Sequence, residues 1–317
     1  MATTTITEVA SGINNFYNRS MLKKAYPLLV HTRWAQVRDI PRNSSEVIKF
    51  RRYTVLTAAT TALTEGTAPT STTLAITNVT ATVLQYGAFV QLTDYLLYTT
   101  LDPILTETAD LLGQQAGNTL DQLCRDVIIA GTTVQYASSA TTRATVTASM
   151  KLNRDEVREA VRTLHGNNAA KISSMVNPST GFNTSPLNAA YICIISHNTL
   201  FDIKDEVGWI PVEEYANKSD VMEGEVGALD EVRFVMTTNA KTFSSTVTVH
   251  GSLIIGADFY GISRVSGEAM RNIIKPLGSA GTSDPLDQNS TSGWKASFVA
   301  KILNENFGIR IEHAVSS

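Results

Sequence analysis

Residues 57–73 are the part of the chain that most limits its possible folds. They consist mainly of Thr, Ala and Ser and offer almost nothing that a core could bury. β-prone segments flank them at 47–56 and 74–92, and in the second of these apolar and polar residues alternate with a period of two. The sequence therefore predicts a long hairpin over 49–92 with a soft tip. Because an isolated two-stranded ribbon is only marginally stable in water, the hairpin must lie on its own body or on another subunit.

The clearest helix signal follows this hairpin. Asp102 is a good N-cap, Pro103 suits the first helical position, and Glu107 and Asp110 lie near the start, where the helix dipole favours negative charge. With Gly131 as the stop, about 27 residues would span about 40 Å, a length typical of a structural beam. Residues at spacings of three and four predict one apolar stripe along the helix: Leu105, Thr108, Leu112, Ala116, Leu120, Leu123 and Val127.

Weaker signals predict the remaining elements. An amphipathic helix is expected over 14–26, and Asn153 with Glu156 has the spacing of a capping box that opens a second helix, ending at Gly166. Strands are expected at 189–196, 232–237, 246–250, 294–303 and 307–314. A short helix is expected at 198–207, an apolar element at 252–262 and an exposed loop at 277–293.

Charge is distributed unevenly along the chain, although the net charge is only −3. Residues 1–52 carry nine Lys/Arg and three acids, a local +6, so the other 265 residues sum to −9, and 53–124 contains no Lys or Arg. This asymmetry favours head-to-tail contact between copies or contact of the basic arm with a polyanion, although an ordinary solvated surface explains it equally well. The candidate contacts between subunits are Arg42, Arg51, Arg52, Glu65, Asp94 and Glu107.

Motifs for catalysis are absent from the sequence. HExxH, the GxxxxGK phosphate loop and GxGxxG do not occur, and none of the five histidines has a second ligand at a metal-like spacing. Ser196 and His197 are neighbours in an expected strand, where adjacent side chains point to opposite faces. We therefore expect no enzyme, no catalytic residue, no cofactor and no metal.

Two other groups have ordinary structural explanations. Cys124 and Cys193 stand alone and are expected to be buried reduced thiols. An acidic cluster matches no calcium loop and is expected to be a solvated face: Asp202, Asp205, Glu206, Glu213 and Glu214.

The ends and composition of the chain indicate where it works. The N-terminus lacks a basic-then-apolar secretory signal, and no stretch approaches the roughly 20 apolar residues that span a bilayer. We expect synthesis in a cytoplasm, without membrane contact. A pI near 6.0 and the absence of a nucleic-acid reader motif leave only non-specific nucleic-acid contact by the basic arm.

Three segments and the order of the elements resemble a known family. The segments are GEVGALDEVRFV at 224–235, GADFYG at 256–261 and GWKASFVAKILNENFGIR at 293–310. They are similar to the major capsid proteins of the phage N-four-like family, which have the Hong Kong ninety-seven type of tailed-bacteriophage capsid fold. The resemblance covers nearly the whole chain, and the order of the motifs is more specific than any one of them.

This resemblance implies an α+β fold with five parts. They are an N-terminal arm (1–48), an extended loop hairpin (49–95), a peripheral domain with a spine helix (96–149), an axial domain (150–284) and return strands of the peripheral domain (285–317). It also implies hexamers and pentamers that close into an icosahedral head around double-stranded DNA, in the virion, after assembly in the host cytoplasm. An encapsulin-like compartment shell is the alternative.

The same resemblance implies how the shell closes and what else it contacts. Some relatives use an isopeptide bond from a Lys in the extended loop, but 53–92 contains no Lys, so closure is expected to be non-covalent. Only about 50 residues precede the hairpin, so a separate scaffolding protein is expected, together with a portal and a decoration protein.

Overall fold

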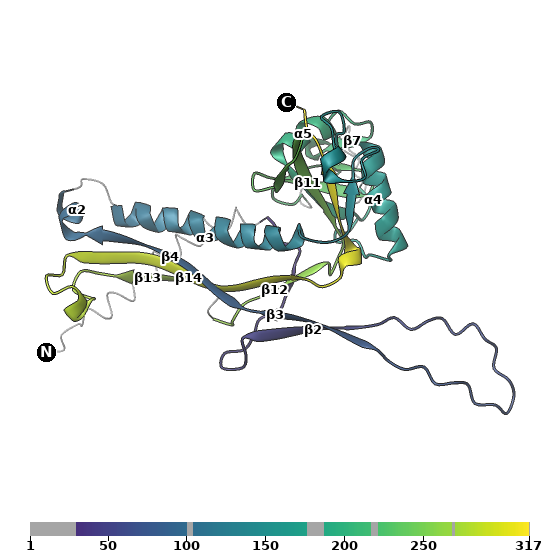
Figure 1. Ribbon diagram of the computed structural model, residues 1–317, viewed down its shortest axis with the longest axis horizontal. Helices are drawn as coiled ribbons and strands as arrows, with labels where there is room; N and C mark the ends of the chain where they lie inside the picture. The colour runs from purple at the N-terminus through teal and green to yellow at the C-terminus, as the bar shows by residue number, and fades with distance from the viewer. Residues whose placement is uncertain (1–29, 100–103, 176–186, 217–220, 268–269, 317) are drawn as a thin grey trace.

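The fold consists of two sheets with attached helices and a ribbon that projects from them (Figure 1). A computed structural model describes residues 30–99, 104–175, 187–216, 221–267 and 270–316. Within these residues the strands form a five-stranded sheet, an eight-stranded sheet and a two-stranded sheet. The predicted α+β class is confirmed.

The five-stranded sheet carries the long helix α3 (Ile104–Ile128) along one face. Its strand order is β1-β12-β14-β13, and β4 also pairs with β14. The strands are β1 (Gln36–Val37), β4 (Leu84–Thr93), β12 (Tyr260–Ser263), β13 (Arg271–Lys275) and β14 (Asn289–Ile302). Leu112 and Ala116 of α3 pack on Trp294 and Ala296, which alternate on one face of β14.

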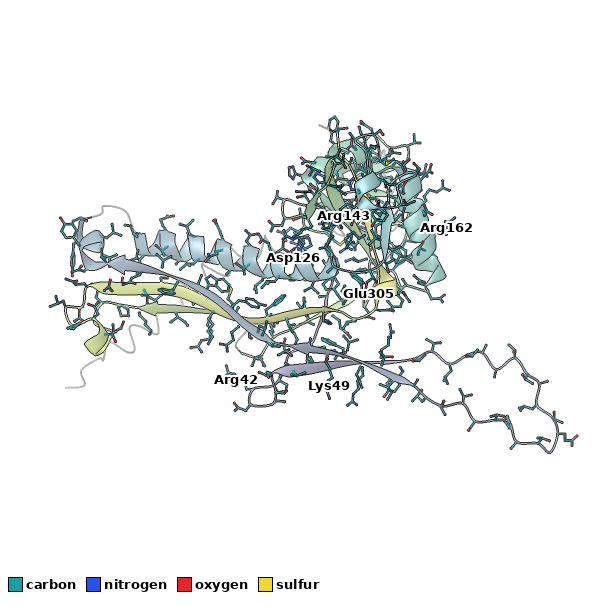
Figure 2. The ribbon with its side chains drawn as sticks, in the orientation of Figure 1. Arg42, Lys49, Asp126, Arg143, Arg162 and Glu305 are labelled. Atoms are coloured by element: carbon teal, nitrogen blue, oxygen red, sulfur yellow. The ribbon has the colours of Figure 1, made fainter. Side chains whose placement is uncertain are left out.

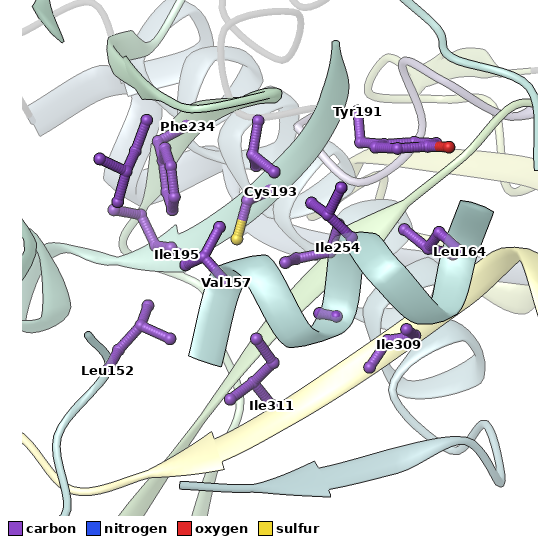
Figure 3. Packing of buried hydrophobic residues seen from close by; sticks show 14 of the residues in the cluster. Leu152, Val157, Leu164, Tyr191, Cys193, Ile195, Phe234, Ile254, Ile309 and Ile311 are labelled. Carbon is purple, nitrogen blue, oxygen red and sulfur yellow. The ribbon is translucent and has the colours of Figure 1, made fainter. Parts of the chain in front are cut away.

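The eight-stranded sheet forms the compact domain near the C-terminus. Its order is β5-β15-β11-β6-β9-β8-β7, with β10 paired to β11. The strands are β5 (Val134–Tyr136), β6 (Tyr191–Ser196), β7 (Trp209–Pro211), β8 (Glu225–Leu229), β9 (Val232–Thr237), β10 (Thr242–Ser244), β11 (Thr248–Ile255) and β15 (Gly308–His313). Helices α4 (Arg154–Gly166) and α5 (His197–Ile203) belong to this domain, and Figure 3 shows Val157 and Leu164 of α4 packed with Cys193, Ile254 and Ile311.

Local sequence explains why these elements form. Asn153 caps α4 by accepting a hydrogen bond from the Glu156 backbone N–H (2.9 Å), as the spacing predicts. The Glu156 carboxylate does not return to the cap, as a full capping box requires, but accepts from the Ser138 N–H and the Gln135 amide. All residues of β6 are buried, as expected of its continuous apolar run.

The predicted hairpin is shorter than expected. β2 (Val47–Tyr53) pairs in antiparallel register with β3 (Ile76–Thr82), but β4 leaves the ribbon and pairs with β14 over its whole length. The prediction missed this because β3 and β4 share one continuous β-prone run. A short helix, α2 (Asp94–Thr99), follows β4.

Residues near the C-terminus are divided between the two large sheets, although we expected 285–317 to return to one domain. β14 lies in the five-stranded sheet, but β15 pairs with β11 and β5 in the eight-stranded sheet. The strand expected at 307–314 is present as β15, and five of its six residues are buried. The expected loop at 277–293 ends earlier, because β14 begins at Asn289.

The long helix α3 lies within the range that the sequence predicts, but its buried face differs from the predicted apolar stripe. Its stripe is rotated: Ala109, Gly113 and Cys124 are buried, whereas Leu105, Leu120, Leu123 and Val127 are only partly covered. The prediction weighted large apolar residues, but small ones allow the closest packing against a sheet. The expected cap residues Asp102 and Pro103 and the helix expected at 14–26 lie outside the described residues.

Candidate assembly surfaces

The ribbon formed by β2 and β3 is the most exposed part of the described structure. Every residue in 51–78 is exposed, and 54–75 contains no helix or strand. Val55 is 92% exposed and Leu63 77% exposed. Figure 1 shows this tip extending away from both large sheets. The unfavourable free energy of exposing these apolar side chains to water is removed only when another surface covers them.

The base of the ribbon is held by one face. Phe50 and Ile48 pair with Val79 and Ala81 on that face, and Phe50 lies so close to Gly261 of β12 that a Cβ there would come within 3.0 Å of its ring. Period-two alternation places Lys49 and Arg51 on the opposite face. The ribbon therefore presents cations outward where it leaves the sheet.

A buried carboxylate ties the start of the described chain to α3. Asp121 accepts hydrogen bonds from the backbone N–H groups of Val30 and His31 (2.9 and 2.8 Å), from the His31 ring (2.9 Å) and from the Asn239 amide (3.1 Å). Cys124 donates to the His31 carbonyl oxygen (3.2 Å), and so does the Tyr260 hydroxyl. These contacts join the chain before β1, the long helix and the loop after β9.

Two buried carboxylates and their arginine partners fix the inside of the eight-stranded domain. Arg233 donates to both carboxylate oxygens of Glu225 (2.6 Å each), and the Tyr215 hydroxyl donates to the same group (2.7 Å). Glu312 is fully buried and lies between Arg143 and Arg310. All of these charges are compensated inside the domain, as burial requires, so they hold the fold and are closed to a ligand.

The predicted contact residues do not form one cluster. Arg42 donates to the Ser266 and Gly267 carbonyl oxygens (3.0 and 3.1 Å) and so fixes its own loop. Arg51 and Arg52 are exposed on β2, and Glu65 is exposed in the tip. The other two lie near the far end of the five-stranded sheet: Asp94, which accepts from the Tyr95 N–H (2.6 Å) at the start of α2, and Glu107, exposed on α3. Figure 2 shows Arg42 and Lys49 near the base of the ribbon.

The residues considered for chemistry have structural roles. Ser196 is buried and caps α5 by accepting from the Asn198 N–H (3.3 Å), while His197 is exposed. Burial raises the pKa of the Cys124 and Cys193 thiols, which are both free and fully buried. Asp202 pairs with Lys151 (3.3 Å) and therefore leaves the expected acidic face.

Metal-binding clusters and membrane-spanning helices are both absent from the described residues. Across the part of the chain that the structure describes, no three His, Cys, Asp or Glu side chains gather where they could hold a metal ion. No helix in the same ranges has the length and apolar character to cross a membrane.

A long helix on a five-stranded sheet, a projecting ribbon and a separate eight-stranded domain together define the fold of phage capsid proteins. The capsid of Ralstonia phage GP4 matches with a TM-score of 0.67 and 13% identity, over 89% of this chain and 87% of that chain. The head structure of Helicobacter pylori bacteriophage KHP40 matches with a TM-score of 0.62 and 13% identity, over 88% and 87% of the two chains. The cyanophage Pam1 capsid has a TM-score of 0.62 and 12% identity, over 91% and 93%. No family model and no curated protein sequence matches the chain.

Proposed function

We propose that the chain is the major capsid protein of a tailed bacteriophage, a structural subunit without enzymatic activity. Many copies, as hexamers and pentamers, would form an icosahedral head around double-stranded DNA through non-covalent contacts. The observation that carries this proposal is the ribbon at 51–78, which is exposed throughout in a chain with a capsid fold. Such a segment gains stability only by covering another molecule.

The proposed division of the chain is based on the two sheets. In this proposal the five-stranded sheet with α3 is the peripheral domain, and the eight-stranded sheet with α4 and α5 is the axial domain near the capsomer centre. Residues 1–48 would be the arm, and β15 would belong to the axial domain. A separate scaffolding protein, a portal and a decoration protein are the remaining partners, and packaged DNA would make non-specific contacts.

Electron microscopy of the chain produced together with a candidate scaffolding protein tests the proposal. We expect closed shells or capsomers in which this chain is the main component. Particles from infected cells should contain DNA. Shells that hold protein cargo and no genome would show a compartment shell of the encapsulin type instead, and a monomer at all concentrations with scaffold present would refute both functions.

A further inference from the structure

Three of the five histidines gather at one end of the eight-stranded sheet. His250 of β11 lies directly opposite His313 of β15, and the two rings stack with their centroids 6.3 Å apart. They are 5% and 0% exposed. Burial lowers the pKa of His250, and the charge of the nearby His197 ring at the start of α5 lowers it further. The domain therefore holds two neutral imidazole rings side by side in its interior.

Hydrogen bonds fix the position of the proton on the His313 ring. Nδ1 lies 2.8 Å from the Ala314 carbonyl oxygen, which can only accept, so Nδ1 carries the hydrogen. Nε2 lies 2.8 Å from the Ser252 hydroxyl oxygen, and in the neutral ring it accepts the hydroxyl hydrogen. A second proton at Nε2 would displace that hydrogen, although Ser252 is fully buried. The surroundings of His313 therefore suit the neutral ring.

His250 also lacks a group that would stabilise a charged ring. Its Nδ1 atom is buried and has no hydrogen-bond partner among the described residues. A proton on this atom would be an unpaired buried donor, which is costly. If both rings were protonated, their charges would also repel each other at 6.3 Å, where little water screens them. Each protonation therefore favours a conformation in which the rings reach water.

Residues 314–316 follow β15 and are fastened to α5 beside these rings. The Ser316 N–H donates to the Asp202 Oδ2 atom (2.9 Å), and the Ser316 hydroxyl donates to the other oxygen of the same carboxylate. The Ala314 carbonyl oxygen accepts from the His313 ring. The segment is therefore attached both to α5 and to the buried histidine pair.

Asp202 links the segment to the protonation of His313. Burial lowers the pKa of His313 to about 4, although the Ala314 carbonyl oxygen and the charge of Asp202 favour the protonated ring. At present the Asp202 carboxylate binds Ser316 and pairs with Lys151 (3.3 Å). A proton on His313 gives this carboxylate a buried cation to bind in place of its present partners. The hydrogen bonds that hold Ser316 are then weakened.

The other charged groups around the pair do not offset a proton on His313. Lys151 lies beside the 314–316 segment and, as a cation, opposes a further positive charge. Glu312 precedes His313 in β15, but it points to the opposite face of the sheet. On that face Arg143 and Arg310 bind its carboxylate.

We propose that the His250–His313 pair is an acid-sensitive switch that releases residues 314–316 from α5. In the released form the rings reach water and bind protons at their ordinary pKa, so release increases as the pH falls from about 6.5 toward about 4. The sheet itself stays folded, because the apolar cluster under α4 contains no side chain that titrates in this range. The switch belongs to the single chain and acts whether or not copies assemble.

Hydrogen–deuterium exchange of the full soluble chain at pH 7 and pH 5, corrected for intrinsic exchange rates, tests the switch. One ring that titrates at about 4 in the closed form and at about 6.5 in the released form should increase the released fraction about twentyfold between these pH values. Peptides that contain 314–316 should lose protection, and peptides from 191–196 should keep it. No change at 314–316, or equal loss in both regions, would overturn the proposal.

Three variants separate the switch from general acid sensitivity. His313→Gln cannot gain a charge, so the pH response at 314–316 should be several times smaller than in the native chain. His165→Gln is the matched control, because its ring is 49% exposed on α4, and its response should equal that of the native chain. Asp202→Ala should release 314–316 already at pH 7 and leave 191–196 protected. A native response in His313→Gln, or full protection of 314–316 in Asp202→Ala, would show that no such switch exists.

Discussion

The His31 Nδ1 atom lies 2.9 Å from the Asp121 Oδ2 atom, and the two side chains are 3% and 0% exposed. Burial alone would raise the pKa of Asp121, but the hydrogen bonds and charge of His31, together with the Asn239 amide, outweigh it and hold the pKa below its ordinary value. The ionised carboxylate therefore stabilises the fold above its ordinary pKa. This contribution is lost as the pH falls through the lower pKa of the folded state.

Replacing Asp121 should damage the fold rather than the surface. Asp121→Ala leaves two backbone N–H groups and two side chains without their acceptor, so we expect the free energy of unfolding to fall by about 3 to 5 kcal/mol. Chemical denaturation of the soluble protein measures this. Asp126→Ala is the matched control on the same helix, where the carboxylate is 50% exposed, and it should cost less than about 1 kcal/mol. Equal losses from the two variants would contradict the role of Asp121.

His313 should make stability depend on pH. Burial lowers its pKa to about 4, and Ser252 and the Ala314 carbonyl oxygen hold its ring in place (2.8 Å each). Between pH about 6.5 and about 4, the unfolded chain binds a proton that the folded chain does not, so the free energy of unfolding falls as the pH drops through this window. The loss attributable to His313 should approach about 3 kcal/mol at the lower end.

Denaturation of the native chain and His313→Gln across this pH range measures that contribution. The comparison uses the difference between the two proteins at each pH, so other titrating groups cancel. We expect the variant to be less stable at neutral pH and to lose less on acidification. A difference that stays constant from pH 7 to pH 4 would contradict the prediction.

The predictions from sequence succeeded where local chemistry decides the structure. The Asn153 cap and the strand at 232–237 depend on adjacent residues, and the structure places both as expected. The hydrogen bonds to the buried Asp121 carboxylate were missed because its partners are about 90 and 118 residues away in the chain. A groove between β4 and β13 was missed for the same reason, since it is formed where Gly293 of β14 pairs with Phe89 and Ile273.

The face of α3 that packs on the sheet can be tested with two adjacent leucines. Leu112 is 3% exposed and Leu111 is 63% exposed. Leu112→Asp places an unpaired charge against Trp294 and Ala296, so we expect the protein to be insoluble or unfolded. Leu111→Asp should remain soluble with native circular dichroism. Leu120→Asp should cost less than Leu112→Asp, because Leu120 is only partly buried.

The cations at the base of the ribbon should act on assembly and not on folding. Arg51 and Arg52 are exposed on β2, and neither forms an ion pair among the described residues. Replacing both with Glu should leave the thermal unfolding midpoint of the soluble protein within about 2 °C, because exposed charges contribute little to stability. Particle yield, measured by sedimentation, should fall strongly, since like charges then face the acidic remainder of a neighbouring copy.

The conservative pair Arg51→Lys with Arg52→Lys separates charge from shape in this experiment. It keeps both positive charges, so particle yield should stay near that of the native chain if long-range attraction guides the contact. Raising the salt concentration should lower the assembly rate of the native chain and of the Lys variant in parallel. Normal yield from the Glu variant would show that the basic arm and the acidic remainder are unrelated to assembly. Loss of yield in the Lys variant would show instead that the planar guanidinium groups bind specific partner atoms.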